Sequence, residues 1–481
     1  MFPNADHNRT RAVEPISRPK PQFASYQPPM PAAAPIELAD HNLFHKLAVY
    51  SGVAWLLVFL GVVPELLAYL LHVNSYVLYI VAPPAILGVF LTGAIPRTMK
   101  HPAGKYWVAF VLLMILATPF STWPGASFRR DMDYIRYSLP LLFVAGGIAL
   151  NWKEIRFFFY AIALGGMLIL LAARLFGSVE AGRVSLDSSG TIGNPNDLAA
   201  HLLLVLPFIL FVVIDKKLPF LLRFCLVGAI GFGIWTILGT ASRGALIGIA
   251  VSFLCLLLHA SLQQRVIVII GGVILAVILP GLLPASTLGR LSSLFNEKDA
   301  EAVESQDSRA YLFKKSVEYT LQHPLLGVGP DQFSNYEGKM SLNKGVNGNW
   351  HATHCAFTQV SSECGIPAML FFIMGIGSSL ATVRKTWKQA KRLGFKEIEN
   401  ACVCYITAMV GFMCAITFLA NAYRSYLPIM VGLGIAIGAT AARHMAANPI
   451  GTAIPTLANI FPNNNAFAGK ARPPLNNSFG L

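Results

Sequence analysis

The chain has 481 residues, of which 55% are hydrophobic and only 12% are charged, and its mean hydropathy is +0.57. This composition excludes a water-soluble globule, because too few polar residues are present to cover its surface. The formal net charge of +14 is typical of basic residues that set membrane topology or face lipid, and no nucleic-acid motif accompanies it. We therefore expect a membrane protein without a nucleic-acid partner.

Apolar runs long enough to cross a bilayer, about 20 residues each, recur from Leu47 to Met445. They are rich in Leu, Ala and Gly, and they lack the polar and apolar alternation of barrel strands. The sequence predicts an all-α polytopic membrane protein of about twelve transmembrane helices. Pro64 lies inside the first run, where a proline can end the helix and leave a half-helix beyond it. The expected spans are 47–71, 75–96, 104–120, 134–150, 156–176, 197–214, 218–238, 243–259, 265–284, 357–383, 400–422 and 426–445.

The segments outside these spans differ in composition. Residues 1–42 are rich in proline among polar residues, which predicts a disordered tail, and residues 448–481 predict a second flexible tail. Residues 285–356 carry balanced charge, helix signals and aromatic residues, so we expect one large loop domain there. Helices 1–9 then occupy residues 43–284, and helices 10–12 occupy residues 357–447.

Lysines and arginines in short loops set the orientation of a membrane protein. If the amino terminus is cytoplasmic, both tails and the basic segment from Arg384 to Lys396 are cytoplasmic, and residues 285–356 are extracytoplasmic. Arginines nevertheless occur in predicted outer loops, where such residues are normally scarce. A guanidinium offers a planar fork that fits paired phosphate oxygens, although each arginine alone is equally typical of an interfacial salt bridge. These arginines are Arg129, Arg130, Arg183, Arg243 and Arg424.

Two short motifs precede the loop domain. The segment from Gly193 to Asp197, Gly-Asn-Pro-Asn-Asp, is rich in turn residues, and its last Asn or Asp can cap the following span. By itself it indicates only a tight loop. The segment from Thr240 to Gly244 places Arg243 at the positive end of a helix. An anion there would lower the repulsion between the guanidinium group and the positive end of the helix dipole. We therefore expect Arg243 to bind a phosphate group.

The third motif runs through the loop domain and begins with an amphipathic helix. Ser308 is the expected N-cap of this helix, next to Arg309, and the helix should end near His323-Pro324. A turn at Gly327-Val328-Gly329 follows, because glycine pairs before a proline are typical of turns.

His354 is the candidate general base. We expect it in the first turn of the tenth span, on one face with Thr358 and Ser361, where the helix dipole keeps an imidazole neutral near pH 7. Glu363 should lie on the opposite face and be structural, with Arg424 as one candidate partner. A metal site from His351, His354 and Cys355 is an alternative, but the spacing arises easily by chance and no His-Glu-x-x-His pattern is present, so we expect no metal.

In this order, the motifs resemble the O-antigen ligase superfamily, which includes O-antigen ligases, O-antigen polymerases and some protein oligosaccharyltransferases. Two residues depart from the family. Asn, Ser or Gln is usual at the position of Cys355, and Gly, Thr or Tyr is usual at the position of Ala368. Both functions, a typical ligase and a polymerase, therefore stay open. The motifs that carry the resemblance are Gly193 to Asp197, Ser242-Arg243-Gly244, Arg309, His323 to Gly329, and His354 with Glu363 to Pro367.

The resemblance implies a metal-independent glycosyltransferase without cofactors, in the bacterial inner membrane, with an extracytoplasmic active site. Its partners would be an undecaprenyl-pyrophosphate-linked glycan donor, a glycan or lipid acceptor, and membrane lipids. Arg243 and Arg309 would hold the pyrophosphate, and His354 would take the proton of the acceptor hydroxyl. A transporter or flippase for lipid-linked glycans, or a scaffold protein, is the alternative. The supporting residues would be Arg129, Arg130, Arg183, Asn194 and Arg424.

Overall fold

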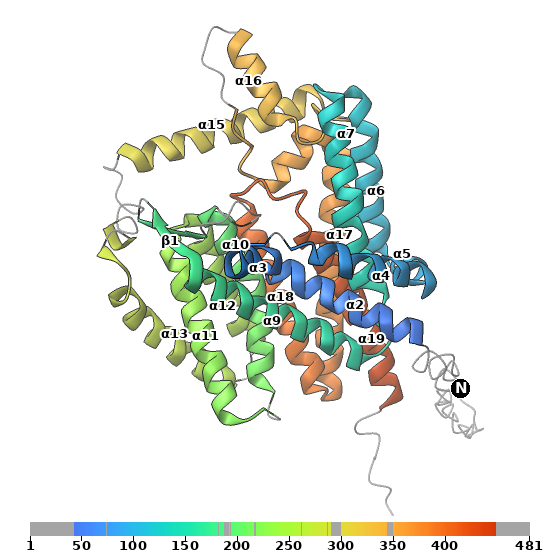
Figure 1. Ribbon diagram of the computed structural model, residues 1–481, viewed down its shortest axis with the longest axis vertical. Coiled ribbons are helices and arrows are strands. Elements are labelled where there is room, and N and C mark those ends of the chain that lie inside the picture. Colours follow the sequence, from blue (N-terminus) through green and yellow to red (C-terminus); the bar gives the residue numbers. More distant parts are fainter. Residues whose placement is uncertain are drawn as a thin grey trace, which may run out of the picture.

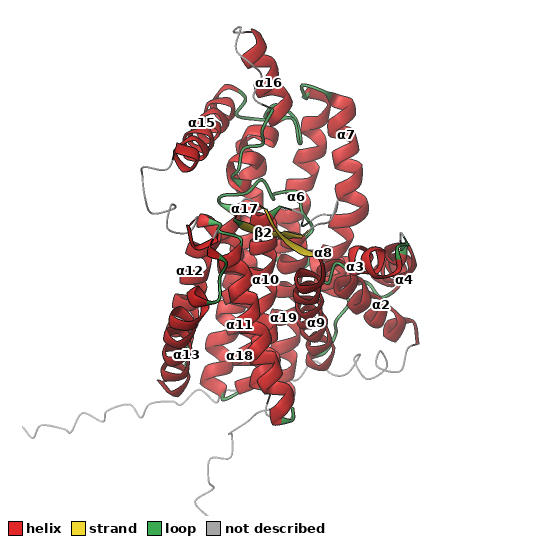
Figure 2. Cartoon of the chain, turned by 60° about the vertical axis from the view of Figure 1, so that its left-hand side comes forward, coloured by secondary structure: helices red, strands yellow, loops and turns green. Residues whose placement is uncertain are grey.

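The computed structural model describes residues 43–448, apart from residues 74, 181, 187–191, 193, 216–217, 261, 286, 290–299 and 344–349. The tails predicted at 1–42 and 448–481 lie outside the described residues, with the exception of Asn448. Helices make up nearly all of the regular structure, and one short antiparallel hairpin is present (Figures 1 and 2).

The elements follow the chain in three groups. The first comprises α2 (Leu43–Leu60), α3 (Val63–Leu71), α4 (Val77–Leu91), α5 (Ala94–Met99), α6 (Pro102–Ala117), η1 (Thr118–Phe120), α7 (Pro124–Asp133), the π-helical turn η2 (Tyr134–Ser138) and α8 (Leu139–Gly147). The second comprises α9 (Trp152–Phe176), β1 (Gly177–Glu180), β2 (Arg183–Leu186), α10 (Pro195–Ile214), α11 (Phe220–Gly239), α12 (Arg243–His259) and α13 (Leu262–Gly281). The third comprises α15 (Ala300–Gln322), α16 (Phe333–Asn343), α17 (Ala356–Leu393), α18 (Lys396–Ile416) and α19 (Tyr426–Ala447).

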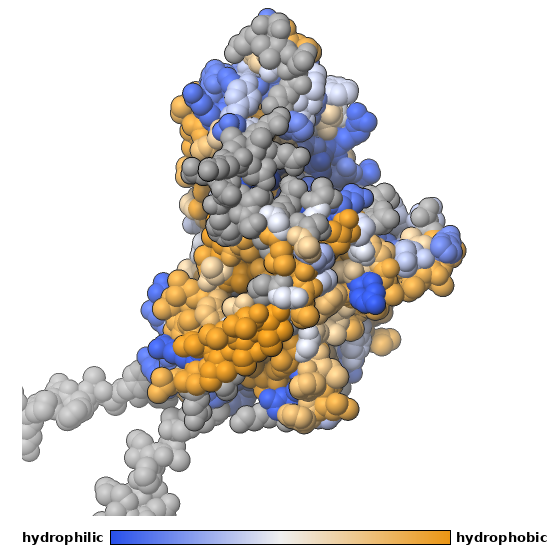
Figure 3. Space-filling model, turned by 90° about the vertical axis from the view of Figure 1, so that its left-hand side faces the viewer, coloured by the Kyte–Doolittle hydropathy of each residue, from blue (hydrophilic) through white to orange (hydrophobic). Residues whose placement is uncertain are grey.

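Eight helices in the described part of the chain are long and apolar enough to cross a membrane. Most of α10, α18 and α19 is buried, so these helices form the middle of the bundle, whereas α11 turns most of its surface outward. Phe220, Leu221 and Phe224 of α11 are exposed, as are Val273 and Val277 of α13. Figure 3 shows a broad apolar surface on the lower part of the molecule, as expected of helices that contact lipid. The eight helices are α2, α6 with η1, α9, α10, α11, α17, α18 and α19.

Some predicted boundaries are corrected. The run at 47–71 is divided into α2 and α3, as the proline predicts: Val62 has a left-handed φ of 46°, and Pro64 lies in the first turn of α3. The span expected at 134–150 begins instead at Pro124, because α7, η2 and α8 follow one another without a gap. The hairpin of β1 and β2 was not predicted, since strands of four residues are too short for a period-two pattern to be recognised.

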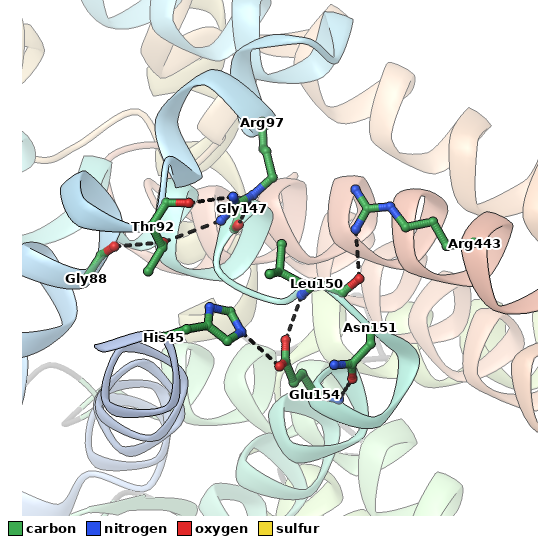
Figure 4. A network of polar contacts seen from close by, with 9 residues as sticks. All are labelled: His45, Gly88, Thr92, Arg97, Gly147, Leu150, Asn151, Glu154 and Arg443. Carbon is green, nitrogen blue, oxygen red and sulfur yellow. Dashed lines mark hydrogen bonds and ion pairs between the residues drawn. The ribbon is translucent and has the colours of Figure 1, made fainter. Parts of the chain in front are cut away.

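A polar network ties five helices together at one end of the bundle (Figure 4). Glu154, near the start of α9, accepts a hydrogen bond from the Leu150 amide at 2.6 Å and pairs with His45 of α2 at 2.9 Å. Arg97 of α5 donates to the Gly147 carbonyl and Arg443 of α19 to the Leu150 carbonyl, each at 2.7 Å. Carbonyl groups at the end of a helix lack helical partners and carry partial negative charge, so Arg97 stabilises the end of α8, and Arg443 holds the loop that leads to α9.

The helix α17 connects this end with the opposite one. It has 38 residues, about 57 Å at 1.5 Å per residue, so its two ends lie far apart. Its first residues lie with α15 and α16, which project at the top of Figure 1, and its last residues carry the basic segment that begins at Arg384. The residues predicted to be extracytoplasmic and cytoplasmic therefore gather at opposite ends of the molecule.

Candidate functional site

A break in α17 joins two motifs that are distant in the sequence. Gly365 has non-helical backbone angles, φ 86° and ψ 171°, so carbonyl groups just before it lose their helical partners. The carbonyl groups of Ser362 and Glu363 instead accept hydrogen bonds from the amides of Val328 and Gly329, both at 2.9 Å. The amide of Ile366 donates to the Pro324 carbonyl at 2.8 Å. The loop that follows α15 is therefore held directly against the kink of α17.

Three glycines are required for this close approach. Gly327, Gly329 and Gly365 all have positive φ angles, which side chains rarely adopt. A Cβ atom on Gly365 would overlap the backbone of Leu325, and one on Gly327 would overlap the backbone of Glu363. The glycine motifs recognised in the sequence thus build one backbone junction.

Glu363 stabilises this junction. Its carboxylate is buried and accepts hydrogen bonds from the amides of Asp331 at 3.0 Å and Phe333 at 3.1 Å. Phe333 is the first residue of α16, so the carboxylate satisfies amides that have no helical partner and lies at the positive end of the helix dipole. The partners of Glu363 are these backbone amides and the side chain of Tyr423 rather than Arg424, and its structural role stays a prediction. Arg130 adds to the junction by donating to Asp331 Oδ2, with the Nε atom at 3.0 Å.

The helix α15 lies on α17 beside this junction. The hydroxyl groups of Thr320 and Ser361 are 2.8 Å apart, so the buried Ser361 packs against α15. The helix also begins earlier than predicted, at Ala300, so Ser308 lies inside it and is not an N-cap. The longer helix and its contact with α17 fix the position of Arg309.

His354 is placed differently from the prediction. The helix α17 begins at Ala356 with Cys355 as its N-cap, so His354 precedes the first turn and lies outside the helix. Its backbone is left-handed, with a φ of 53°. Such a conformation costs on the order of 1–3 kcal/mol for a residue other than glycine, and it is common where a side chain must be aimed at a site.

The charges of three predicted site residues act on one another. Burial and then the positive charge of Arg243 lower the pKa of Arg309. Burial, followed by the charges of Arg309 and His351, lowers the pKa of His354. The start of α12, the helix α15 and the loop before α17 therefore bring Arg243, Arg309 and His354 into one site. The Nε atom of Arg243 is buried, and no hydrogen-bond partner for it occurs among the described residues.

The surroundings of Arg243 are tightly packed. Ala241 is buried with a left-handed φ of 48°, a second strained residue at the site. A Cβ atom on Gly244 would lie 2.8 Å from the ring of Phe418, so the start of α12 rests on the loop between α18 and α19. The glycine of the Ser242-Arg243-Gly244 motif is needed for this contact.

Arg183 links the two motifs that precede the loop domain. Its Nε atom donates to the Thr240 carbonyl at 2.9 Å, and Nη2 donates to Asn196 Oδ1 at 2.7 Å. Asn194 caps α10, because its side chain accepts from the Asn196 amide at 2.9 Å, whereas the last Asn or Asp of the motif was the expected cap. Asn196 itself was not predicted as a site residue, although it belongs to the motif.

The other two supporting arginines are exposed. Arg424 follows α18 and interacts electrostatically with Asp197, which also accepts a hydrogen bond from Asn421 at 2.9 Å. Arg129 has an exposed side chain on α7. Within the described part of the chain, no group of three or more His, Cys, Asp or Glu residues is arranged to hold a metal ion.

These features define a multi-pass helical membrane protein in which Arg243, Arg309 and His354 lie near one another at one end of the bundle. Residues 228–373 match the family model described as O-antigen ligase, which confirms the predicted resemblance to the O-antigen ligase and polymerase superfamily over this region. The matched segment contains Arg243, Arg309 and His354. No curated protein matches the chain.

Proposed function

We propose that this protein transfers a glycan from an undecaprenyl-pyrophosphate donor to a hydroxyl acceptor, as an O-antigen ligase or as an O-antigen or exopolysaccharide polymerase. The observation that carries the proposal is the electrostatic coupling of Arg309 to both Arg243 and His354. Two guanidinium groups held together by the fold repel each other unless an anion lies between them. A pyrophosphate supplies that anion, and the family match supplies the glycan chemistry.

In this mechanism, the bond between the anomeric carbon of the donor and the pyrophosphate breaks, and a bond from that carbon to the acceptor oxygen forms. Arg243 and Arg309 stabilise the negative charge of the leaving pyrophosphate. His354 takes the proton of the acceptor hydroxyl, and its lowered pKa keeps the imidazole neutral and able to accept it. The donor itself supplies the bond energy, so the reaction needs no nucleotide sugar, and it is metal-independent in this proposal because the two guanidinium groups stabilise the leaving pyrophosphate.

We further propose twelve membrane spans in the bacterial inner membrane, with the site on the extracytoplasmic side. The eight long apolar helices supply eight spans. The apolar helices α4, α12 and α13 and the continuous segment formed by α7, η2 and α8 supply the others. A transporter or flippase would instead need ionisable residues near the middle of several helices. Arg243, Arg309, His354 and the charged groups of Figure 4 lie near helix ends or outside the spans.

The test is glycan transfer by the purified protein in liposomes, with an undecaprenyl-pyrophosphate-linked glycan, a hydroxyl acceptor and a chelator present. We expect new glycosidic bonds and free undecaprenyl pyrophosphate in equal amounts. Arg243→Lys and Arg309→Lys should be severely impaired, because a lysine cannot reproduce the bidentate fork. Arg223→Lys is the matched control, since Arg223 donates to a backbone carbonyl at the other end of the bundle. Normal transfer by both site variants would refute the pyrophosphate role.

Product size separates the two reactions within this proposal. A polymerase extends the glycan on its own donor and yields a ladder of lengths, whereas a ligase attaches the donor glycan once to a different acceptor. Movement of intact donor across the bilayer without a new glycosidic bond would support the flippase instead.

A further inference from the structure

The helix α15 carries an apolar surface that no described residue covers. Phe313, Val317 and Leu321 are 50%, 39% and 70% exposed. They are spaced by four residues, so they lie along one face of the helix and form a continuous line, which we call the apolar stripe. The buried face of α15 is a different one, and it carries Leu312, Ser316, Tyr319 and Thr320.

The apolar stripe is turned away from α16. Tyr311 and Tyr319 of α15 both donate hydrogen bonds to Glu337 of α16, so α16 lies on the side of these two tyrosines. At 3.6 residues per turn, the middle of the apolar stripe lies roughly 160° around the helix from the mean direction of Tyr311 and Tyr319. Figures 1 and 2 show α16 on one side of α15, and the ends of α10 and α12 on the other side. The apolar stripe therefore faces the side on which the apolar helices α10 and α12 end.

The charge pattern of α15 fits a membrane interface. Lys314 is exposed and lies roughly 20° from Leu321 around the helix, where its ammonium group can reach lipid phosphates while its methylene groups lie on apolar surface. The remaining exposed arc carries Asp307, Gln322 and Tyr311, and the side chain of Glu318 is 38% exposed, so acidic groups also lie on this arc. In Figure 1, α15 runs across the direction of α11 rather than along it. An amphipathic helix at an interface lies in the membrane plane in this way.

We propose that α15 is an interfacial helix whose apolar stripe lies in the lipid leaflet on the side of the site. Arg309 is one helical turn before Phe313, so the contact with lipid sets the depth of this guanidinium at the level of lipid phosphates. The inference does not depend on the reaction, because it concerns the protein in a bilayer without any donor.

The test uses the full-length protein in liposomes of zwitterionic and anionic phospholipid, with no donor added. Cys225 is the exposed cysteine and is first replaced in a Cys225→Ser background. Spin labels are attached to Leu321→Cys, Val317→Cys and the matched control Gln322→Cys, which is adjacent in the sequence but lies on another face of α15. Accessibility to oxygen and to a water-soluble nickel complex then gives the depth of each label.

We expect the labels at 317 and 321 to be accessible to oxygen, protected from nickel, and about 5–10 Å below the lipid phosphates, whereas the label at 322 is accessible to nickel. Equal nickel accessibility at all three positions would overturn the proposal, because the stripe would then face water. Dipolar broadening between two labelled copies would assign the stripe to a protein interface instead. If the labels became protected from nickel only after undecaprenyl-pyrophosphate-linked glycan was added, the apolar stripe would bind the lipid chain of the donor. This result would also refute the contact with the membrane.

Discussion

Arg309 lies close enough to His354 for its positive charge to lower the pKa of the imidazole, in addition to the effect of burial. The two residues are far apart in the chain, and α15 and the start of α17 bring them together. The relationship gives Arg309 two roles in the proposed reaction: it attracts the pyrophosphate, and it keeps the neighbouring base neutral.

The pH dependence of transfer should therefore change when Arg309 loses its charge. If His354 is the base, activity requires its neutral form, so the rate is full above its pKa and is lost as the pH falls through that value. Arg309→Gln removes a charge that lowers the pKa of His354, so the acid limb of kcat/KM should move to higher pH. Arg309→Lys keeps the charge and should leave the acid limb in place while the rate falls. An unchanged acid limb in Arg309→Gln would show that the two residues are not coupled in this way.

The kink of α17 should require a glycine. Gly365→Ala should destabilise the protein by about 1–3 kcal/mol, because alanine is strained at a φ of 86° and its Cβ atom would overlap the backbone of Leu325. Thermal unfolding of the purified protein measures the change. Gly377→Ala is the control in the same helix: a Cβ atom there meets nothing within 4 Å, and alanine favours a helix by about 1 kcal/mol. Equal thermal shifts in the two variants would contradict the role of the kink.

Arg183 should support Arg243 through its link between Thr240 and Asn196. Arg183→Ala and Asn196→Ala should each lower kcat/KM, and the double variant should lose less than the sum of the two. A coupling free energy of about 0.5–3 kcal/mol is expected for residues that share a hydrogen bond. Strict additivity in this double-mutant cycle would mean that the link does not position the site.

The end of α15 at Gln322 and the end of α17 near Lys391 should be accessible from opposite sides of the membrane. We expect a membrane-impermeant maleimide to label Gln322→Cys in spheroplasts and to label Lys391→Cys only after permeabilisation, because the basic residues near Lys391 favour the cytoplasm. Both variants are made in the Cys225→Ser background. The reverse labelling pattern would place the site in the cytoplasm, where the proposed donor chemistry does not apply.

The sequence predicted the apolar helices, because span length is a local signal, and helix-end motifs singled out Arg243, Arg309 and His354, whose roles stay predictions. It did not predict how the motifs meet. The hydrogen bonds that join Gly329 to Glu363 and Arg183 to Asn196 depend on tertiary packing, and only the glycines gave a local indication of the first. His354 was expected inside a helix because its spacing to Thr358 is helical, but the helix begins two residues later. Asp331, the partner of Arg130, directly follows the glycine turn and could have been recognised there.

The central claim is that His354 is the general base. Measuring donor binding and transfer rate separately in His354→Ala tests this claim most directly. In liposomes with a chelator present, this variant should still bind the lipid-linked donor but lose about 10²- to 10⁴-fold in transfer rate, because removal of a base affects the transition state more than the bound ground state. Cys355→Asn, which restores the usual family residue next to the histidine, should be tolerated. Retained transfer by His354→Ala at normal protein levels would contradict the assignment of His354 as the base, and activity that the chelator abolishes would contradict a metal-independent reaction.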